Sequence, residues 1–240
     1  MAKTQQGAFD FRYHHIDAPT IQDDDYGREH KKRILTCTCL PATFRDPLVG
    51  MLRGCPWVIR RKLDGANIRI QWDGEQALWN GKTNNFQCGA RLTEYMNNTF
   101  LEEIFEEKFG RDANVVIFGE HMGPKVQGNE LDLDDDQIFV YDVNINGFWQ
   151  PKENVREIAS YFGCLTCYDV MWGRDFNDNI VDYSCEALEK RSLRDIIMLV
   201  TAGRFKTWEG IVATPEVECR NQKGERVIVK VKTKDYYRGE

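Results

Sequence analysis

The stretch that decides the fold covers residues 57–79 and reads WVIRRKLDGANIRIQWDGEQALW. Its first two apolar runs, Trp57–Arg60 and Asn67–Trp72, have the composition of β-strands. A third run, Gln76–Trp79, follows through the pair Asp73-Gly74, which is a strong hairpin signal between two such runs. This part of the sequence therefore predicts strands, the last two of them antiparallel neighbours.

The same pattern continues along the chain in both directions from this hairpin. Further strands are predicted at Val115–Phe118, Ile138–Val143, Gly210–Ala213 and Val227–Lys232. Helices are predicted at Thr93–Phe109, ending at Gly110, at Pro151–Phe162, ending at Gly163, and from a cap at Ser184 toward Val200. Because the strands are mostly neighbours joined by short turns, with helices inserted between groups, the expected fold class is α+β with largely antiparallel sheets.

Composition limits the kinds of protein that this chain can be. The 240 residues are 42% hydrophobic and 29% charged, which excludes collagen, coiled coils and disordered tails and fits one globular domain over residues 1–240. The longest aliphatic run, Ile196–Val200, is far shorter than a bilayer span, and no apolar stretch follows the first residues. We therefore expect a soluble, unexported, cytoplasmic protein without a membrane partner, whose eight cysteines are reduced.

The net charge of −6 bears on the choice of partner. A protein with this charge does not attract polyanions as a whole. Any nucleic acid must therefore be bound by a local basic surface.

The chemistry-bearing residues begin with Lys62-Leu63-Asp64-Gly65, directly after an apolar strand. A glycine at this turn allows a ligand to approach the backbone beside the lysine amine. Alone, this tetrapeptide is equally typical of a plain turn with an exposed lysine. Four more short motifs follow it in order: Phe118-Gly119-Glu120, Ile138–Asp142, Trp208–Val212 and Val229–Lys232.

In this order the five motifs resemble those of the covalent nucleotidyltransferases, which include ATP-dependent DNA and RNA ligases and GTP-using mRNA capping enzymes. Within that superfamily the sequence is most similar to the RNA ligase 2 family of phages and kinetoplastid RNA-editing ligases. Asn67 follows Lys62 by five positions, as in that family. The basic residue Lys82 follows Lys62 by about twenty positions, which also matches the family. The resemblance covers the motifs between about residues 57 and 234.

The resemblance implies a role for each matching residue. Lys62, Lys230 and Lys232 would be catalytic, with Lys62 forming a lysyl–AMP intermediate and the two late lysines meeting the α-phosphate. Glu209 would hold a metal ion, and Glu120 would bind the ribose. The nucleotide-binding residues would be Arg61, Leu63, Asn67, Lys82, Glu120, Phe139, Lys230 and Lys232.

Two of these assignments also have a basis in the residues themselves. Lys230 and Lys232 alternate along a predicted strand, so both point to one face. Phe139 is the aromatic chosen to stack on adenine, but Ile138 and Val140 are its competitors and core packing is an equal use for it. His121 either approaches the nucleotide or supports the end of its strand.

Lysine is a poor nucleophile at neutral pH because its usual pKa is about 10.4. Lowering this pKa to near 7 requires a bias of about 4 to 5 kcal/mol against the ammonium form. Partial desolvation and neighbouring cations can supply this bias. The same cations can hold the triphosphate, so one cationic cluster would serve both purposes.

The chain departs from the family pattern in three places. Arg61 stands where family members often carry an acid, which affects the expected purine contacts. Lys82 stands where an arginine is common, and a lysine lacks the bidentate geometry. Eight residues follow Lys232, too few for the additional C-terminal domain of these enzymes, so an accessory protein or domain is expected to supply end binding.

The expected function is that of an ATP-dependent RNA ligase acting with Mg²⁺, or with Mn²⁺ in its place. Its substrate would be RNA with 5′-phosphate and 3′-hydroxyl ends, nicked or broken, in the host cytoplasm if the protein is encoded by a phage. The alternatives are a capping-type guanylyltransferase and a non-catalytic module that binds nucleotides or RNA ends.

Overall fold

The computed structural model describes residues 5–6, 13–19, 44–126, 131–170, 172–174, 180–182 and 191–236, with the backbone alone at 5–6, 172–174 and 180–182. The chain divides into two compact units. The first unit comprises Met1–Tyr13 and Asp64–Asp169, and the second comprises His14–Leu63 and Val170–Glu240.

The first unit is built on a seven-stranded sheet with the order β1-β4-β3-β5-β6-β7, in which β8 also pairs with β6. Its longer strands all pair antiparallel, whereas the two-residue strands β1 and β8 pair parallel to their neighbours. The strands are β1 (Gln5–Gln6), β3 (Ala66–Trp72), β4 (Ala77–Asn80), β5 (Val115–Met122), β6 (Gln137–Ile145), β7 (Phe148–Trp149) and β8 (Leu165–Thr166).

The predicted hairpin between β3 and β4 is confirmed. The Asp73 carboxylate accepts hydrogen bonds from the backbone amides of Glu75 and Gln76, at 2.9 and 2.8 Å, and so closes the turn. The aspartate of the Asp73-Gly74 pair therefore forms the local side-chain turn for which this residue type is favoured.

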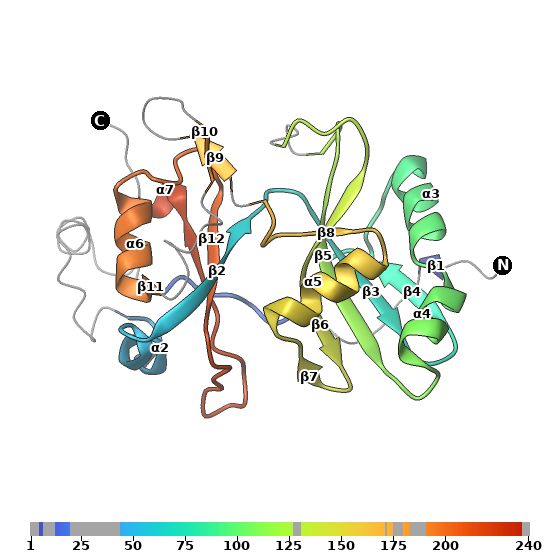
Figure 1. Ribbon diagram of the computed structural model, residues 1–240, viewed down its shortest axis with the longest axis horizontal. Helices are drawn as coiled ribbons and strands as arrows, with labels where there is room; N and C mark the ends of the chain where they lie inside the picture. The colour runs from blue at the N-terminus through green and yellow to red at the C-terminus, as the bar shows by residue number, and fades with distance from the viewer. Residues whose placement is uncertain are drawn as a thin grey trace. The chain divides into compact units, whose positions relative to one another are not determined.

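Three helices belong to the first unit: α3 (Ala90–Thr99), α4 (Glu102–Phe109) and α5 (Lys152–Tyr161) (Figure 1). The prediction of one helix over Thr93–Phe109 was wrong, because the chain leaves helical geometry at Phe100. The break allows the fully buried Phe100 ring to pack against Phe162, with ring centroids 5.3 Å apart. Tertiary packing here overrides helix periodicity.

The two faces of this sheet differ in chemistry. One face carries Ile68, Ile70 and Trp72, all buried. Trp72 stacks on Phe105 of α4, with ring centroids 5.8 Å apart, so the helices cover this apolar face. Because side chains alternate along a strand, Asn67 and its neighbours at every second position lie on the opposite, more polar face.

The second unit contains a four-stranded sheet with the order β11-β2-β12-β13, in which every pair is antiparallel. A separate pair of short strands, β9 and β10, accompanies it. The strands are β2 (Pro56–Lys62), β9 (Trp172–Arg174), β10 (Ile180–Asp182), β11 (Arg191–Ser192), β12 (Gly210–Pro215) and β13 (Val229–Lys232). The helices are α2 (Pro47–Leu52), α6 (Leu193–Thr201) and α7 (Thr233–Tyr236).

Helix α6 begins at Leu193 and is capped by Ser192, whose hydroxyl accepts from the Asp195 amide at 3.2 Å. The predicted cap, Ser184, lies outside the described residues. Serine is nevertheless the residue type at the observed cap, because its hydroxyl can satisfy a backbone amide of the first turn.

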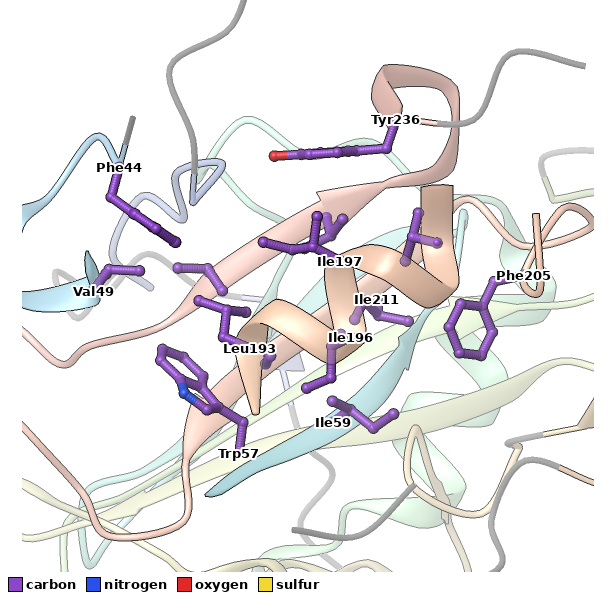
Figure 2. Packing of buried hydrophobic residues seen from close by; sticks show 14 of the residues in the cluster. Phe44, Val49, Trp57, Ile59, Leu193, Ile196, Ile197, Phe205, Ile211 and Tyr236 are labelled. Atoms are coloured by element: carbon purple, nitrogen blue, oxygen red, sulfur yellow. The ribbon is translucent and has the colours of Figure 1, made fainter. Parts of the chain in front are cut away.

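The core of the second unit lies between α6 and one face of its sheet. Figure 2 shows Leu193, Ile196 and Ile197 of α6 directed toward the strands that carry Ile59 and Ile211. All five side chains are buried. Since alternate residues of each strand face this core, the residues between them, Lys62 included, face the other way.

The described part of the chain holds no helix that is both long enough and apolar enough to cross a bilayer.

Candidate active site

Three of the residues singled out in the sequence come together at one end of the sheet in the second unit. Strand register places Lys62 opposite Gly210, and Gly210 opposite Lys232. Directly opposed residues of antiparallel strands share a face, so the two lysines flank Gly210 on the face away from the core. The next row on that face holds Arg60, Val212 and Lys230.

Glu209 joins the two lysines of the first row. Its carboxylate contacts the Lys62 amine through one oxygen and lies 2.8 Å from the Lys232 amine through the other. All three side chains are partly buried, with exposed fractions between 16% and 27%. We refer to Lys62, Glu209 and Lys232 as the charged cluster.

The pKa of Glu209 reflects this setting. Burial alone raises the pKa of this carboxyl, but hydrogen bonds from Lys232 and Lys62, together with their positive charges, outweigh burial and bring it below its usual value. Glu209 is therefore a carboxylate at neutral pH, held by two ammonium groups.

A glycine is required at position 210, beside this cluster. Its φ angle is +157°, and a Cβ atom there would lie 2.2 Å from the Val231 carbonyl oxygen. No side chain can be accommodated at that distance without moving the backbone of β13. The glycine of the Glu209-Gly210 pair thus permits the close pairing of β12 with β13 at the point where Glu209 leaves the sheet.

Two residues expected to bind nucleotide, Arg61 and Leu63, do not lie with the charged cluster. Both are 3% exposed. Arg61 is opposite the core residue Ile211, and its guanidinium lies over the Trp208 ring, 5.0 Å from the centroid. The arginine that shares the face of Lys62 is Arg60.

The other nucleotide-site candidates lie in the first unit. Register places Asn67, Glu120 and Phe139 in one row across β3, β5 and β6. Glu120 accepts a hydrogen bond from the Gly65 amide at 3.1 Å, and a Cβ atom at Gly65 would lie 2.3 Å from the His121 carbonyl oxygen. It is therefore strand β5 that closely approaches the glycine of the Lys62–Gly65 motif.

Tyr141 lies next to the row of Asn67, Glu120 and Phe139, and it was not predicted from the sequence as a site residue. The pairing of β5 with β6 shifts between Phe118 and Gly119, which leaves Tyr141 without a directly opposed residue. Its hydroxyl accepts a hydrogen bond from the Asn67 side-chain amide. Burial raises the pKa of Tyr141 well above its usual value, and nearby Glu120 adds to this effect, so the hydroxyl remains protonated.

The sequence contained one signal for Tyr141, an aromatic residue within the predicted strand Ile138–Val143. Alternation along the strand places Tyr141 on the same face as Phe139, whereas the register shift beside it depends on pairing between strands. No local pattern reports such a shift in register.

Phe139 is buried within the sheet, whereas His121 contacts a carboxylate. Phe139 and its competitor Val140 are each 1% exposed, and the other competitor, Ile138, is fully buried. His121 lies on the opposite face from Glu120, where its Nε2 is 2.9 Å from the Asp136 carboxylate. His121 thus connects β5 to the acidic loop that follows it in sequence.

Lys82 is exposed on the loop that follows β4. Buried Arg69 supports this loop, because its guanidinium donates to the Gly81 carbonyl at 2.7 Å and to the Asn84 side chain at 3.0 Å. A buried, hydrogen-bonded arginine of this kind fixes the backbone next to Lys82.

Comparison with known proteins identifies the family of this chain. The family model described as RNA ligase matches residues 55–232, about three quarters of the chain, and runs through both units. The chain therefore belongs to the RNA ligase family. No curated protein sequence matches it.

Solved structures of a Naegleria gruberi RNA ligase share the fold. A lysine-to-methionine variant with AMP and Mn has 14% sequence identity and a TM-score of 0.50, over 79% of this chain and 53% of that chain. A glutamate-to-alanine variant with AMP and Mn gives the same identity, TM-score and coverage. The present chain thus spans about half the length of the Naegleria ligase.

Glu209 is the member of the charged cluster that could bind a hard divalent cation. Glu209 offers two carboxylate oxygens, and Mg²⁺ is commonly bound by one or two carboxylates together with substrate phosphates and water. Among the described residues no group of three or more His, Cys, Asp or Glu could hold a metal by itself. A cation at Glu209 would therefore share its ligands with a phosphorylated substrate.

Proposed function

We propose that this chain is an ATP-dependent RNA ligase in which Lys62 carries the adenylyl group. The observation that supports this most is the contact of the Lys62 amine with Glu209, which also binds Lys232, at one end of a sheet within the region matched by the RNA ligase family. We also propose that both units act as one nucleotidyltransferase domain over residues 1–240, since the family match extends through both.

The proposed reaction has three steps with balanced bond changes. The neutral Lys62 amine attacks the α-phosphorus of ATP, a phosphoramidate bond forms, and pyrophosphate leaves. A 5′-phosphate of RNA then attacks the same phosphorus, which releases Lys62 and leaves a 5′–5′ pyrophosphate linkage to AMP. Finally a 3′-hydroxyl attacks the 5′-phosphate and displaces AMP, forming the phosphodiester.

The charged cluster explains how the first step could be controlled. While Lys62 donates to Glu209, its lone pair is not available for attack on phosphorus. Entry of a nucleotide with a divalent cation bound at Glu209 would separate these two side chains, and the cation would offset the charge of the phosphates. Lys230 and Lys232, on the same face, would contact the α-phosphate as it gains charge.

The nucleoside is assigned to the first unit. Glu120 would bind the ribose, Asn67 would lie beside it, and Phe139 would contribute to the adenine site. Lys82, exposed on its supported loop, would bind phosphate. Arg61 and Leu63, the remaining residues of the predicted set, are both buried, and no direct contact with the nucleotide is proposed for Arg61.

The proposed substrate is RNA with 5′-phosphate and 3′-hydroxyl ends, nicked or broken, with Mg²⁺ as the metal and Mn²⁺ as its substitute. We place the reaction in the cytoplasm, or in the host cytoplasm for a phage protein. An accessory protein or domain that strengthens end binding is part of the proposal.

Covalent labelling tests the first step. Incubation with Mg²⁺ and ATP labelled at the α-phosphate is expected to give a labelled protein, with the adduct on Lys62 by mass spectrometry. Lys62→Met should abolish the label, whereas Lys223→Met, at an exposed lysine of the β12–β13 connection, should keep it. Labelling by GTP instead would indicate a guanylyltransferase, and no label from either nucleotide would leave a binding module.

Sealing tests the later steps. Preformed 5′-adenylylated RNA bypasses the first step, so wild-type protein is expected to join it to a 3′-hydroxyl end without ATP. Matched nicked and single-stranded substrates, with RNA or DNA on each side of the break, identify the substrate class. Failure to join any adenylylated RNA would contradict the assignment as a ligase even if Lys62 is labelled.

A further inference from the structure

A second group of residues in the same unit lies beneath the charged cluster, on the core side of the sheet. Arg61 is 3% exposed and places its guanidinium over the Trp208 ring, 5.0 Å from the centroid. Phe205 also packs against that ring and stacks on Trp208 with centroids 4.8 Å apart. Arg61, Trp208 and Phe205 thus form a continuous buried stack.

The residues of this stack are connected, through the chain or through hydrogen bonds, to the backbone that carries the charged cluster. Arg61 directly precedes Lys62, and Trp208 directly precedes Glu209. Thr233, which directly follows Lys232, donates its hydroxyl to the Phe205 carbonyl at 3.2 Å and its amide to the Glu209 carbonyl at 2.9 Å. Every member of the charged cluster therefore has a chain neighbour in this buried layer.

The position of the cluster explains why such support is needed. Strand β2 ends at Lys62, β12 begins at Gly210, and β13 ends at Lys232, so the cluster occupies the last row of its sheet. Backbone pairing is least constrained at the ends of elements, where local opening is easiest. In addition, the two lysine side chains carry like charge and repel one another, and Glu209 contacts both of them.

We propose that Arg61 is a positioning residue, which through the Trp208 ring fixes the geometry of Lys62, Glu209 and Lys232, and does not contact the nucleotide. The inference deepens the proposed function and rests on it for its kinetic test. A cation over a buried indole face is among the stronger cation–π arrangements. Small displacements of a reacting group are costly, because the attacking atom must be held in line with its target.

Single-turnover formation of the lysyl adduct is the first test. Arg61→Met keeps the length of the side chain and removes its charge. We expect the rate at saturating ATP to fall roughly ten- to a hundredfold, with the ATP concentration for half-maximal rate unchanged. A rise in that concentration with an unchanged maximal rate would mean that Arg61 contacts nucleotide and would overturn the inference, as would an unchanged rate.

Milder variants test the same contact while preserving more of the core. Arg61→Lys keeps a cation and Trp208→Phe keeps an aromatic face, so both are expected to lose less of the rate than Arg61→Met and Trp208→Leu. Combining Arg61→Met with Trp208→Leu should cost little more than either alone, because both remove one interaction. Full additivity of the two effects would overturn the inference.

Chemical reactivity of the lysines gives a test that does not depend on enzyme activity. Acetic anhydride acylates amines, and mass spectrometry can compare Lys62 with exposed Lys223 in the same molecule. Loss of positioning in Arg61→Met is expected to increase the acylation of Lys62 relative to Lys223 several-fold, since its contact with Glu209 is then less well formed. An unchanged ratio would overturn the inference.

Ile59→Ala is the matched control for general loss of stability. Ile59 precedes Arg61 by two residues on the same core-facing side of β2. We expect it to lower the melting temperature but to leave the Lys62 to Lys223 ratio as in wild type, and an equal change in this ratio would overturn the inference. If wild-type protein forms no adduct with ATP, the proposed function fails while the acylation experiment still decides the role of Arg61.

Discussion

At the scale of single residues, Glu209 has the most informative surroundings. Its two oxygens bind two lysines that come from different parts of the chain, Lys62 being 147 positions away in sequence. Alternation placed Lys230 and Lys232 on one face from sequence alone, and the structure places them so. The inward direction of Arg61 follows from the same alternation, because adjacent strand residues face opposite sides.

The pKa of Glu209 leads to a prediction about stability and pH. Because its pKa is lower in the folded protein than in the unfolded chain, Glu209 stabilises the fold above its ordinary pKa, about 4.3, and this contribution disappears as the pH falls through the lower folded value. Urea unfolding at about pH 7 and about pH 3.5 should therefore show a smaller pH-dependent loss for Glu209→Gln than for wild type.

Other carboxylates titrate over the same range in both proteins, so the comparison between the two is what reports on Glu209. Equal losses of unfolding free energy in wild type and Glu209→Gln would show that the contacts with Lys62 and Lys232 do not contribute to stability.

At the scale of elements, apolar runs and turn residues located most strands of both sheets, and the hairpin at Asp73-Gly74 was predicted correctly. The break between α3 and α4 was not predictable from periodicity, since it arises from the burial of Phe100 against Phe162. Nor was the register shift between β5 and β6 next to Tyr141, whose hydroxyl accepts a hydrogen bond from Asn67. Both features depend on partners that are distant in sequence.

Gly210→Ala tests the requirement for close pairing of β12 with β13. The added methyl group would meet the Val231 carbonyl at 2.2 Å, so we expect a loss of about 2 kcal/mol or more in unfolding free energy and a strong loss of Lys62 labelling by ATP. Gly54→Ala is the control, because a Cβ there meets nothing within 4 Å, and it should change stability by less than about 0.5 kcal/mol. Similar behaviour of the two variants would contradict this account of Gly210.

At the scale of the whole molecule, the ordered motifs allowed the RNA ligase family to be identified from sequence, whereas the division into two units was not evident from composition. The chain crosses between the two units three times, after Tyr13, after Leu63 and after Asp169. The sequence at these points does not have the composition of a linker. Each unit has its own buried side chains, represented by Phe105 in the first and Ile196 in the second.

Separate cores predict additive effects on stability. Ile196→Ala should lower the unfolding free energy by about 2–5 kcal/mol and Phe105→Ala by about 3–5 kcal/mol, because each leaves a cavity. The double variant is expected to lose the sum to within about 0.5 kcal/mol, as for residues that share no partners. Denaturant titration of the four proteins measures this, and a deficit or excess well above that margin would indicate that the two cores are energetically coupled.

The pairing of β2 with β12 and β13 also determines when the chemistry can first exist during synthesis. Lys62 leaves the ribosome before its carboxylate partner and the second lysine, which follow about 150 and 170 residues later. Contacts between such distant parts form slowly, because a long loop must close before they contribute any stability. A nascent chain that has not yet been extended through Lys232 therefore lacks at least one member of the charged cluster, and the proposed adenylylation of Lys62 would have to wait until that lysine has been added.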